Sequence, residues 1–327
     1  GASLTHYFGL GCTVTIPEKL HLKELGNFSF ANFDYVPKTA EELAFDDAES
    51  TKQWYIGDNT ITKVVLPEGV EKINAYAFAN LTALEEIVLP STLTAIEYGA
   101  FYNCSSLKKI TFSGENNVII INQHAFEGCD LEGTIDLSAA CVISDYAFAG
   151  NQDLEGIITT DALLSISQYA FAGCKNLTDV TIESNKVKYG AYAFTGCENL
   201  KSFYVNAAVV PEGMFYQCKK MESVSIGPDV NDIGEFAFRE TQVASFEIAS
   251  GNKAYKVQTA DHILSADGKT LAAVSPNLRD TYTDTNVTAV ANGAFSHNTR
   301  ITAVELPNVT KVGDYAFGSS ESIASVI

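Results

Sequence analysis

The chain has 327 residues, of which 46% are hydrophobic and 19% are charged, so it holds ample material for a core and lacks the composition of a disordered chain. Its 21 Lys and Arg residues against 40 Asp and Glu residues give a net charge of −19, which argues against nucleic acid or an anionic membrane surface as partner. The sequence contains no apolar run of the roughly 18 residues that a membrane-spanning helix needs.

One residue pattern recurs along most of the chain with a period of about 23 residues. Only the gap between Phe238 and Phe295 departs from it, and that gap equals one period plus an insertion of about 34 residues. Fixed self-similarity of this length predicts a solenoid of stacked coils. The pattern is marked by Tyr-Ala-Phe or a variant of it, with Phe at Phe78, Phe101, Phe126, Phe148, Phe171, Phe194, Phe215, Phe238, Phe295 and Phe317.

Residues 1–54 fit the pattern only in part. The segments 14–17 and 25–30 look like a degenerate first unit, whereas 31–54 hold an acidic stretch and the single Trp54. We expect 1–54 to form a degenerate first repeat with a cap or insertion, because the ends of such stacks need covering. The chain begins at Gly1 without a Met, and we expect a secretion signal to have been removed from it.

Residues 55–327 are predicted to form the solenoid itself. In the unit 84–104, Leu84, Ile87 and Leu89 alternate like the inward face of a strand, and Ala100-Phe101 follow on a short helical or 3₁₀ turn. Stacking gives each coil the neighbours that it needs to bury its apolar side. We therefore predict a mainly β, right-handed repeat solenoid with parallel strands and with the Phe side chains stacked in one column.

Five of the seven cysteines share the position three residues after the Phe: Cys104, Cys129, Cys174, Cys197 and Cys218. They could form a metal or disulfide ladder, or be small residues that turn inward. The second interpretation is favoured, because Asn, Thr and Ser occupy the same position in other coils and parallel side chains do not point at one another. We predict that these thiols are reduced and buried.

An insertion interrupts the period at about 250–280. Two short β runs flank Asp267-Gly268, which is a strong turn signal. We expect a β-hairpin that projects from the stack.

The repeated unit L-x-x-I-x-L-P…I-x-x-x-A-F-x-x-C resembles the BspA-type leucine-rich repeat, also found in treponemal surface proteins. The resemblance extends over residues 61–327 and is close at 83–107 and 309–317. It implies a leucine-rich-repeat-like fold, surface display or secretion, and binding to host proteins, glycans or other cells.

Motifs with catalytic or metal-ligand spacing are missing from the sequence. The five His residues are not part of H-E-x-x-H, and neither a G-x-S-x-G elbow nor a P-loop is present. We therefore predict no enzyme activity, no cofactor and no metal.

The candidate binding residues are the strand positions that should face solvent, with the insertion as a side wall. An exposed aromatic on a rigid sheet is the strongest candidate anchor. From these rows and the insertion we select Lys63, Val88, Lys109, Ile158, Tyr204, Glu247 and Asp267.

The predicted function is that of a monomeric binding module, extracellular or on the cell surface, that adheres to a host or extracellular-matrix protein. A glycan-binding module and a structural spacer that displays other domains remain alternatives.

Overall fold

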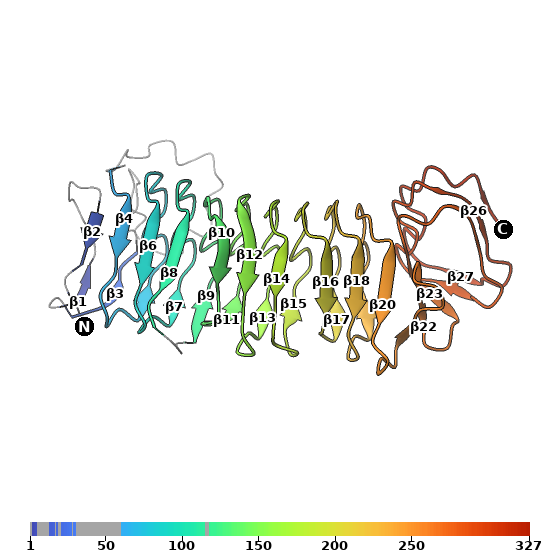
Figure 1. Cartoon of the computed structure of the whole chain (residues 1–327), viewed down its shortest axis with the longest axis horizontal. Helices are drawn as coiled ribbons and strands as arrows, with labels where there is room; N and C mark the ends of the chain where they lie inside the picture. Colours follow the sequence, from blue (N-terminus) through green and yellow to red (C-terminus); the bar gives the residue numbers. More distant parts are fainter. Residues whose placement is uncertain are drawn as a thin grey trace.

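The chain forms an elongated solenoid with its termini at opposite ends (Figure 1). The computed structural model describes residues 2–4, 13–16, 18, 21–27, 29–30, 60–114 and 118–327. About 12 turns of about 22 residues each stack along the axis. The expected cap or insertion at 31–54 lies outside the described residues.

The first strand of each coil contributes to one long face of the stack, which runs across the front of Figure 1 from β2 to β20. Neighbouring strands pair in parallel, as the alternating pattern predicted, and the face divides into four separate sheets. The strands are β2 (Thr13–Thr15), β4 (Lys63–Val65), β6 (Glu86–Leu89), β8 (Lys109–Phe112), β10 (Gly133–Asp136), β12 (Leu154–Ile158), β14 (Asp179–Thr181), β16 (Ser202–Val205), β18 (Ser223–Ile226), β20 (Ser245–Ile248), β24 (Asp280–Thr283), β26 (Ile301–Glu305) and β28 (Ser325–Val326).

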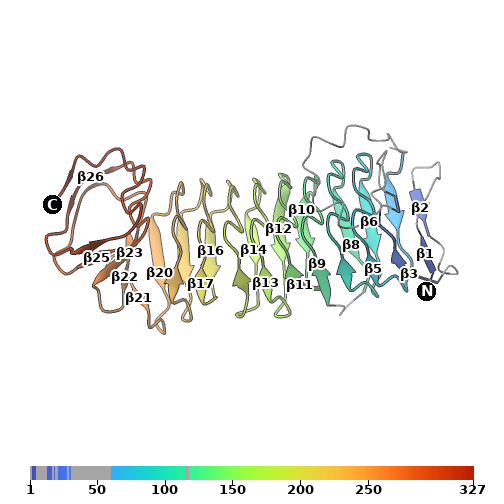
Figure 2. The ribbon, with the colours of Figure 1, turned by 180° about the vertical axis from the view of Figure 1, so that it is seen from behind.

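A second, narrower face is built from the shorter strand that follows in each coil (Figure 2). Its first eight strands form one continuous parallel sheet. The strands are β1 (Ala2–Leu4), β3 (Leu22–Leu25), β5 (Lys72–Ile73), β7 (Ala95–Ile96), β9 (Ile119–Ile121), β11 (Ala140–Ile143), β13 (Ser165–Ile166), β15 (Lys188–Tyr189), β17 (Val209–Val210), β19 (Asp232–Ile233), β25 (Ala289–Val290) and β27 (Lys311–Val312).

The Phe side chains lie between the two faces and stack in a column, as predicted. Neighbouring rings from Phe78 to Phe238 have centroids 4.9–6.4 Å apart and lie nearly parallel. Phe30 adds a rung before Phe78, at 4.9 Å, so the early segment 25–30 takes part in the stack. Because each ring touches the rings above and below it, the column ties the coils together along the axis.

The Ala-Phe segments form successive tight turns, and the predicted helical or 3₁₀ turn is wrong for the described residues. In one coil the amides of Ala77 and Ala79 donate three residues back, to Asn74 and Tyr76, while the amides of Tyr76 and Phe78 donate to the next coil. A helix needs consecutive bonds within the segment, so alternate donation prevents one. The segment also includes a left-handed residue, Tyr76, with φ of 56°.

The expected β-hairpin around Asp267-Gly268 forms, but it is part of the stack, so the expectation that it projects as a side wall is wrong. β21 (Tyr255–Lys256), β22 (His262–Ser265) and β23 (Thr270–Val274) pair antiparallel, and β23 then pairs in parallel with β25. Val274 takes the place of a core Phe, since its amide donates to Ala294 O at 3.0 Å as Phe171 donates to Ala193 O. The gap from Phe238 to Phe295 therefore holds two coils, the first of which is enlarged by the hairpin.

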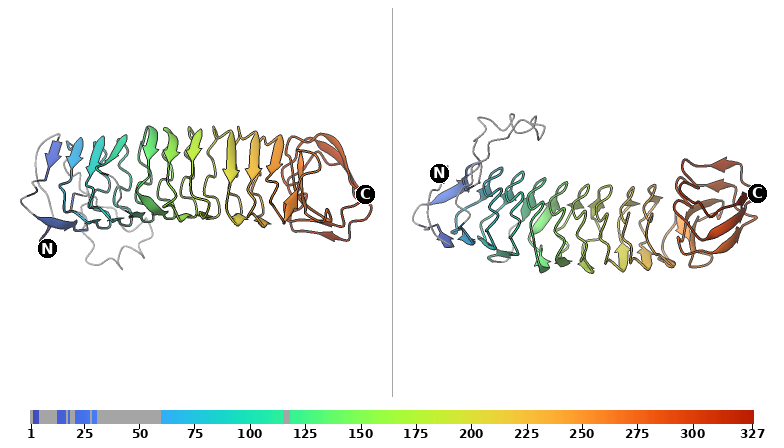
Figure 3. Two further views of the ribbon diagram at one scale, coloured as in Figure 1. Left: turned by 60° about the horizontal axis from the view of Figure 1, so that its bottom comes forward. Right: turned by 90° about the horizontal axis from the view of Figure 1, so that it is seen from above.

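The axis of the stack turns at this hairpin. In Figure 1 the last coils are seen end-on, whereas the earlier coils are seen side-on. In the right-hand view of Figure 3 the last coils stack from top to bottom, whereas the earlier coils stack along the horizontal. The buried core divides within the hairpin, where Ile263 and Ala273 belong to the larger cluster of the earlier coils and Leu264 and Leu271 to the smaller cluster of the last coils. The predicted single Phe column is accordingly interrupted there, and Phe295 and Phe317 form a separate stacked pair at 5.0 Å.

Candidate binding surfaces

Three of the selected residues lie together on the long face near the N-terminal end. The strand register aligns Lys63 with Glu86 and Glu86 with Lys109. Lys63 Nζ lies 2.8 Å from Glu86 Oε2, and the hydrogen bond from Lys63 holds the pKa of the Glu86 carboxyl below its ordinary value. Lys109 Nζ lies 3.9 Å from Glu86 Oε1. Val88 is half-buried beside them, so this region offers paired charges on a shallow apolar base.

The other selected residues lie on different parts of the molecule. Ile158 and Tyr204 are exposed on the long face, at 43% and 53%, but their strands belong to two different sheets. Glu247 lies two strands beyond Tyr204 and accepts a hydrogen bond from Ser225 Oγ at 3.0 Å. Asp267 is in the hairpin turn, which continues the second face rather than the first. The structure thus separates the selected residues into several places.

A ladder of aromatic rings, which the sequence interpretation missed, lines the edge where the tight turns lie. Tyr98, His124, Tyr146, Tyr169 and Tyr192 follow one another with ring centroids 4.9–5.1 Å apart. From His124 onward the rings are nearly parallel, so each ring covers the face of its neighbour. Ring edges and phenol oxygens, rather than open ring faces, meet the solvent along this part of the edge.

Most rungs of this ladder have a left-handed backbone. Tyr146, Tyr169 and Tyr192 have φ of 55–58°. This conformation is uncommon for bulky residues, and the ring stacking offsets its cost. Where Gly99 occupies the position, a Cβ would lie 2.7 Å from the ring of Tyr76, and the neighbouring Tyr98 supplies the rung instead. The signal in the sequence is the Tyr that stands two residues before five of the ten core Phe residues, with His124 at the same position in another coil.

The five cysteines of the shared position are free and buried, as predicted, and each has a structural role. Every one donates its Sγ–H to the carbonyl of the core Phe in the preceding coil, for example Cys174 to Phe148 O at 3.3 Å and Cys218 to Phe194 O at 3.1 Å. Asn151 makes the same bond to Phe126 O. Burial raises the pKa of the Cys174 thiol to about 12. Since the thiolate is the reactive form, burial keeps the Cys174 thiol in its unreactive form.

Thiol titration checks this arrangement. In native protein the six described free cysteines should react slowly with a thiol reagent, because they are buried as thiols. Unfolding without reductant should release at least six thiols. Fewer than six would show that a cysteine described as free is part of a disulfide.

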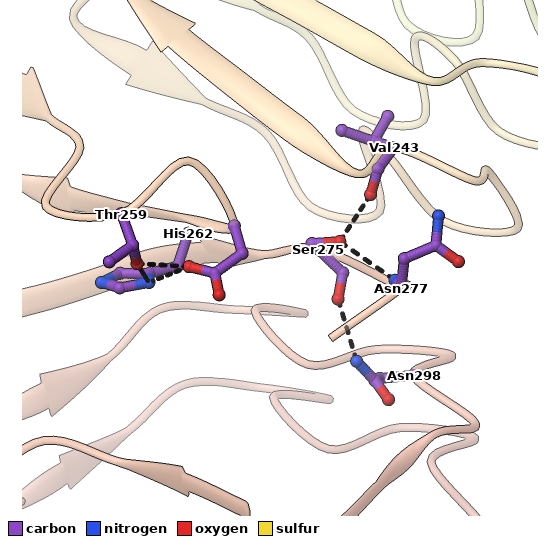
Figure 4. Close-up of polar contacts among 7 residues, drawn as sticks. Val243, Thr259, His262, Ser275, Asn277 and Asn298 are labelled. Atoms are coloured by element: carbon purple, nitrogen blue, oxygen red, sulfur yellow. Dashed lines mark hydrogen bonds and ion pairs between the residues drawn. The ribbon is translucent and has the colours of Figure 1, made fainter. Parts of the chain in front are cut away.

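A buried polar cluster joins the coils on either side of the bend (Figure 4). Ser275 Oγ donates to Val243 O at 2.5 Å, and Asn298 Nδ2 donates to Ser275 O at 2.9 Å. Nearby, His262 Nδ1 lies 2.8 Å from Asp261 Oδ1. Burial raises the pKa of the Asp261 carboxyl, but hydrogen bonds from Thr259 and His262 outweigh it and leave the pKa below its ordinary value. The contacts of Ser275 span the bend, which gives this cluster a structural role.

Metal sites and membrane-spanning helices are both missing from the described residues. Within them, three or more His, Cys, Asp or Glu side chains are nowhere grouped so as to hold a metal ion. Over the same part of the chain, no helix has the length and apolarity to cross a bilayer.

The stacked parallel strands, the central Phe column and the tight turns define a leucine-rich-repeat solenoid. The family model for the BspA type leucine rich repeat region matches residues 51–151, 141–260 and 268–327, in six copies. The chain therefore belongs to the BspA-type leucine-rich repeat family, which confirms the resemblance seen in its sequence. The comparison with curated proteins gives no match.

Three solved bacterial structures are similar to this chain, and the first of them shares its fold. A leucine rich cell surface protein from Faecalibacterium prausnitzii A2-165 matches with a TM-score of 0.51 and 18% identity, over 99% of this chain and 71% of that one. The pneumococcal vaccine antigen PcpA matches over 97% of this chain and 60% of that one, with 17% identity and a TM-score of 0.38. A T. pallidum leucine-rich repeat protein is 24% identical over 55% of this chain and 76% of that one, with a TM-score of 0.39.

Proposed function

We propose that this chain is a non-enzymatic binding module, secreted or displayed on a bacterial surface, that adheres to an extracellular protein. The observation that carries the proposal is the long face of parallel strands, whose outward side chains do not pack in the core and can therefore contact a partner. The family supports it, and so does the similar fold of a protein described as a leucine rich cell surface protein.

A protein partner is favoured over a glycan by the arrangement of the aromatic rings. Sugars stack on open aromatic faces, but along the ladder from His124 to Tyr192 these faces are covered by neighbouring rings. Tyr204 is an isolated exposed aromatic on the long face, where it can act as an anchor in a protein interface. The net charge of −19 favours a partner with basic patches, so association should slow as salt rises.

A binding screen tests the proposed function. The purified chain is passed over immobilised extracellular-matrix proteins and, separately, over polysaccharides. We expect saturable binding to at least one protein, and Tyr204→Ala should weaken it by about 1–2 kcal/mol. Binding to polysaccharides alone would favour the glycan-binding alternative. Binding to neither set would favour a spacer that displays other domains.

A further inference from the structure

One column of side chains on the turn edge places tyrosine beside charged residues at two points. The column follows each core Phe by one residue, and Tyr102 and Tyr216 are its two tyrosines. Glu127 follows Tyr102 on the next coil, and Arg239 follows Tyr216. Tyr102 and Glu127 are related to each other by the same backbone geometry as Tyr216 and Arg239. Asn103 N donates to Glu127 O at 2.8 Å, and Gln217 N donates to Arg239 O at 3.1 Å.

Beside Tyr216, the chain supplies a cation of its own, the guanidinium of Arg239. The guanidinium carbon of Arg239 lies 5.5 Å from the centroid of the Tyr216 ring and 5.4 Å from that of Phe236. Arg239 Nε lies 3.9 Å from Glu240 Oε1, which also accepts the Tyr216 hydroxyl at 3.1 Å. This edge can therefore hold a guanidinium between aromatic rings and a carboxylate.

At the first point the equivalent position supplies a carboxylate instead of a cation. Tyr102 is 39% exposed, and the preceding coil carries only Ala79 in the same column. The Glu127 carboxylate contacts His124 Nδ1 and keeps 29% of its side chain exposed. Burial raises the pKa of the Tyr102 phenol, and the charge of Glu127 raises it further. The same negative field that disfavours a phenolate favours a positive group from outside.

We propose that the Tyr102–Glu127 pair binds an arginine side chain presented by a basic segment of a partner protein. The inference rests on the proposed function and assigns a contact within it. Arginine fits better than lysine, since its planar guanidinium stacks on a ring while it donates to a carboxylate. The net charge of −19 draws such a segment toward the molecule.

The test uses a fluorescein-labelled peptide of alternating Arg and Gly, and the same peptide with citrulline in place of arginine. Fluorescence anisotropy gives the Kd for the whole chain and for each variant. Tyr102→Ala should raise the Kd for the arginine peptide about 2–5-fold, the value of an exposed cation–π contact. Glu127→Gln should also raise it, and the citrulline peptide should bind far more weakly.

Matched controls come from the C-terminal coils. Tyr315→Ala removes a tyrosine that is 70% exposed, and it should leave the Kd unchanged. Glu321→Gln removes an exposed carboxylate and measures the general effect of losing one negative charge, which should be smaller than the effect of Glu127→Gln. Thermal unfolding should give each variant the Tm of the parent. An unchanged Kd in Tyr102→Ala, an equal loss in Tyr315→Ala, or equal binding of the citrulline peptide would overturn the proposal.

The peptide assay and the binding screen test different claims, so a negative result in one does not decide the other. If the parent does not bind the arginine peptide, the Tyr102–Glu127 proposal is wrong, whereas the screen still tests the binding function. If the parent binds the peptide and the Tyr102 effect is found, this contact stands even when none of the screened matrix proteins is a partner.

Discussion

Phe171→Ala should lower the free energy of unfolding by about 3–5 kcal/mol, which is the range for truncation of a fully buried aromatic side chain. Phe171 is completely buried and stacks on Phe148 and Phe194, with ring centroids 5.3 and 5.5 Å away. The coils above and below it are fixed by the other rungs, so the cavity cannot close easily. Urea unfolding followed by circular dichroism measures the loss as a shift of the midpoint.

Tyr204→Ala is the control for this substitution. It also removes an aromatic ring, but from an exposed position on the long face, and should change stability by no more than about 0.5 kcal/mol. If Phe171→Ala were as mild as Tyr204→Ala, the Phe column would not be what holds the middle of the stack together.

Gly190→Ala should lower the free energy of unfolding by about 1–3 kcal/mol, the cost of forcing extra volume into a packed site. A Cβ at Gly190 would lie 2.3 Å from Gln168 N and 2.5 Å from the carbonyl carbon of Ser167. Both are backbone atoms of the preceding coil, and the amide of Gly190 is tied to Ile166 O at 2.8 Å. The clash can therefore be relieved only by moving two coils apart.

Gly251→Ala separates this steric effect from the general effect of replacing glycine. Neither Gly190 nor Gly251 has a positive φ, and a Cβ at Gly251 would meet only the Pro228 side chain, at 3.4 Å. We expect Gly251→Ala to be neutral or to stabilise by about 0.4–1 kcal/mol, because it restricts the unfolded chain. Equal urea midpoints for the two variants would contradict a close approach of the coils at Gly190.

The solenoid architecture could be predicted from the sequence because the residues that form its core recur from unit to unit. The core Phe and the Cys three residues later recur in register, so stacking places each kind of residue in a column. The bend could not be predicted, since Val274 takes a Phe position without the Tyr-Ala-Phe marker. The pattern of core Phe residues therefore predicts an insertion where the structure has a further coil.

The aromatic ladder was missed for a different physical reason. A tyrosine with φ of 55° is unfavourable by local sterics, so the pattern around Tyr169 gives no local signal for this conformation. Contacts with rings of the neighbouring coils make it favourable, and these contacts join residues about one period apart. The alternation along each strand correctly predicts that Ile158 and Tyr204 are exposed on the long face. The repeat pattern does not show that this face divides into separate sheets, because the division depends on hydrogen bonds between particular pairs of strands.

The division of the core at the hairpin has a consequence for how the molecule opens. In a stack of nearest-neighbour contacts, cooperativity passes from coil to coil through shared apolar packing. Here the two clusters are separate and their boundary runs through the hairpin, where hydrogen bonds such as that from Ser275 to Val243 join the coils on either side. We therefore expect the last coils to open and reclose as a separate unit while the longer segment stays intact. A partner held on the earlier coils would remain bound through such an opening.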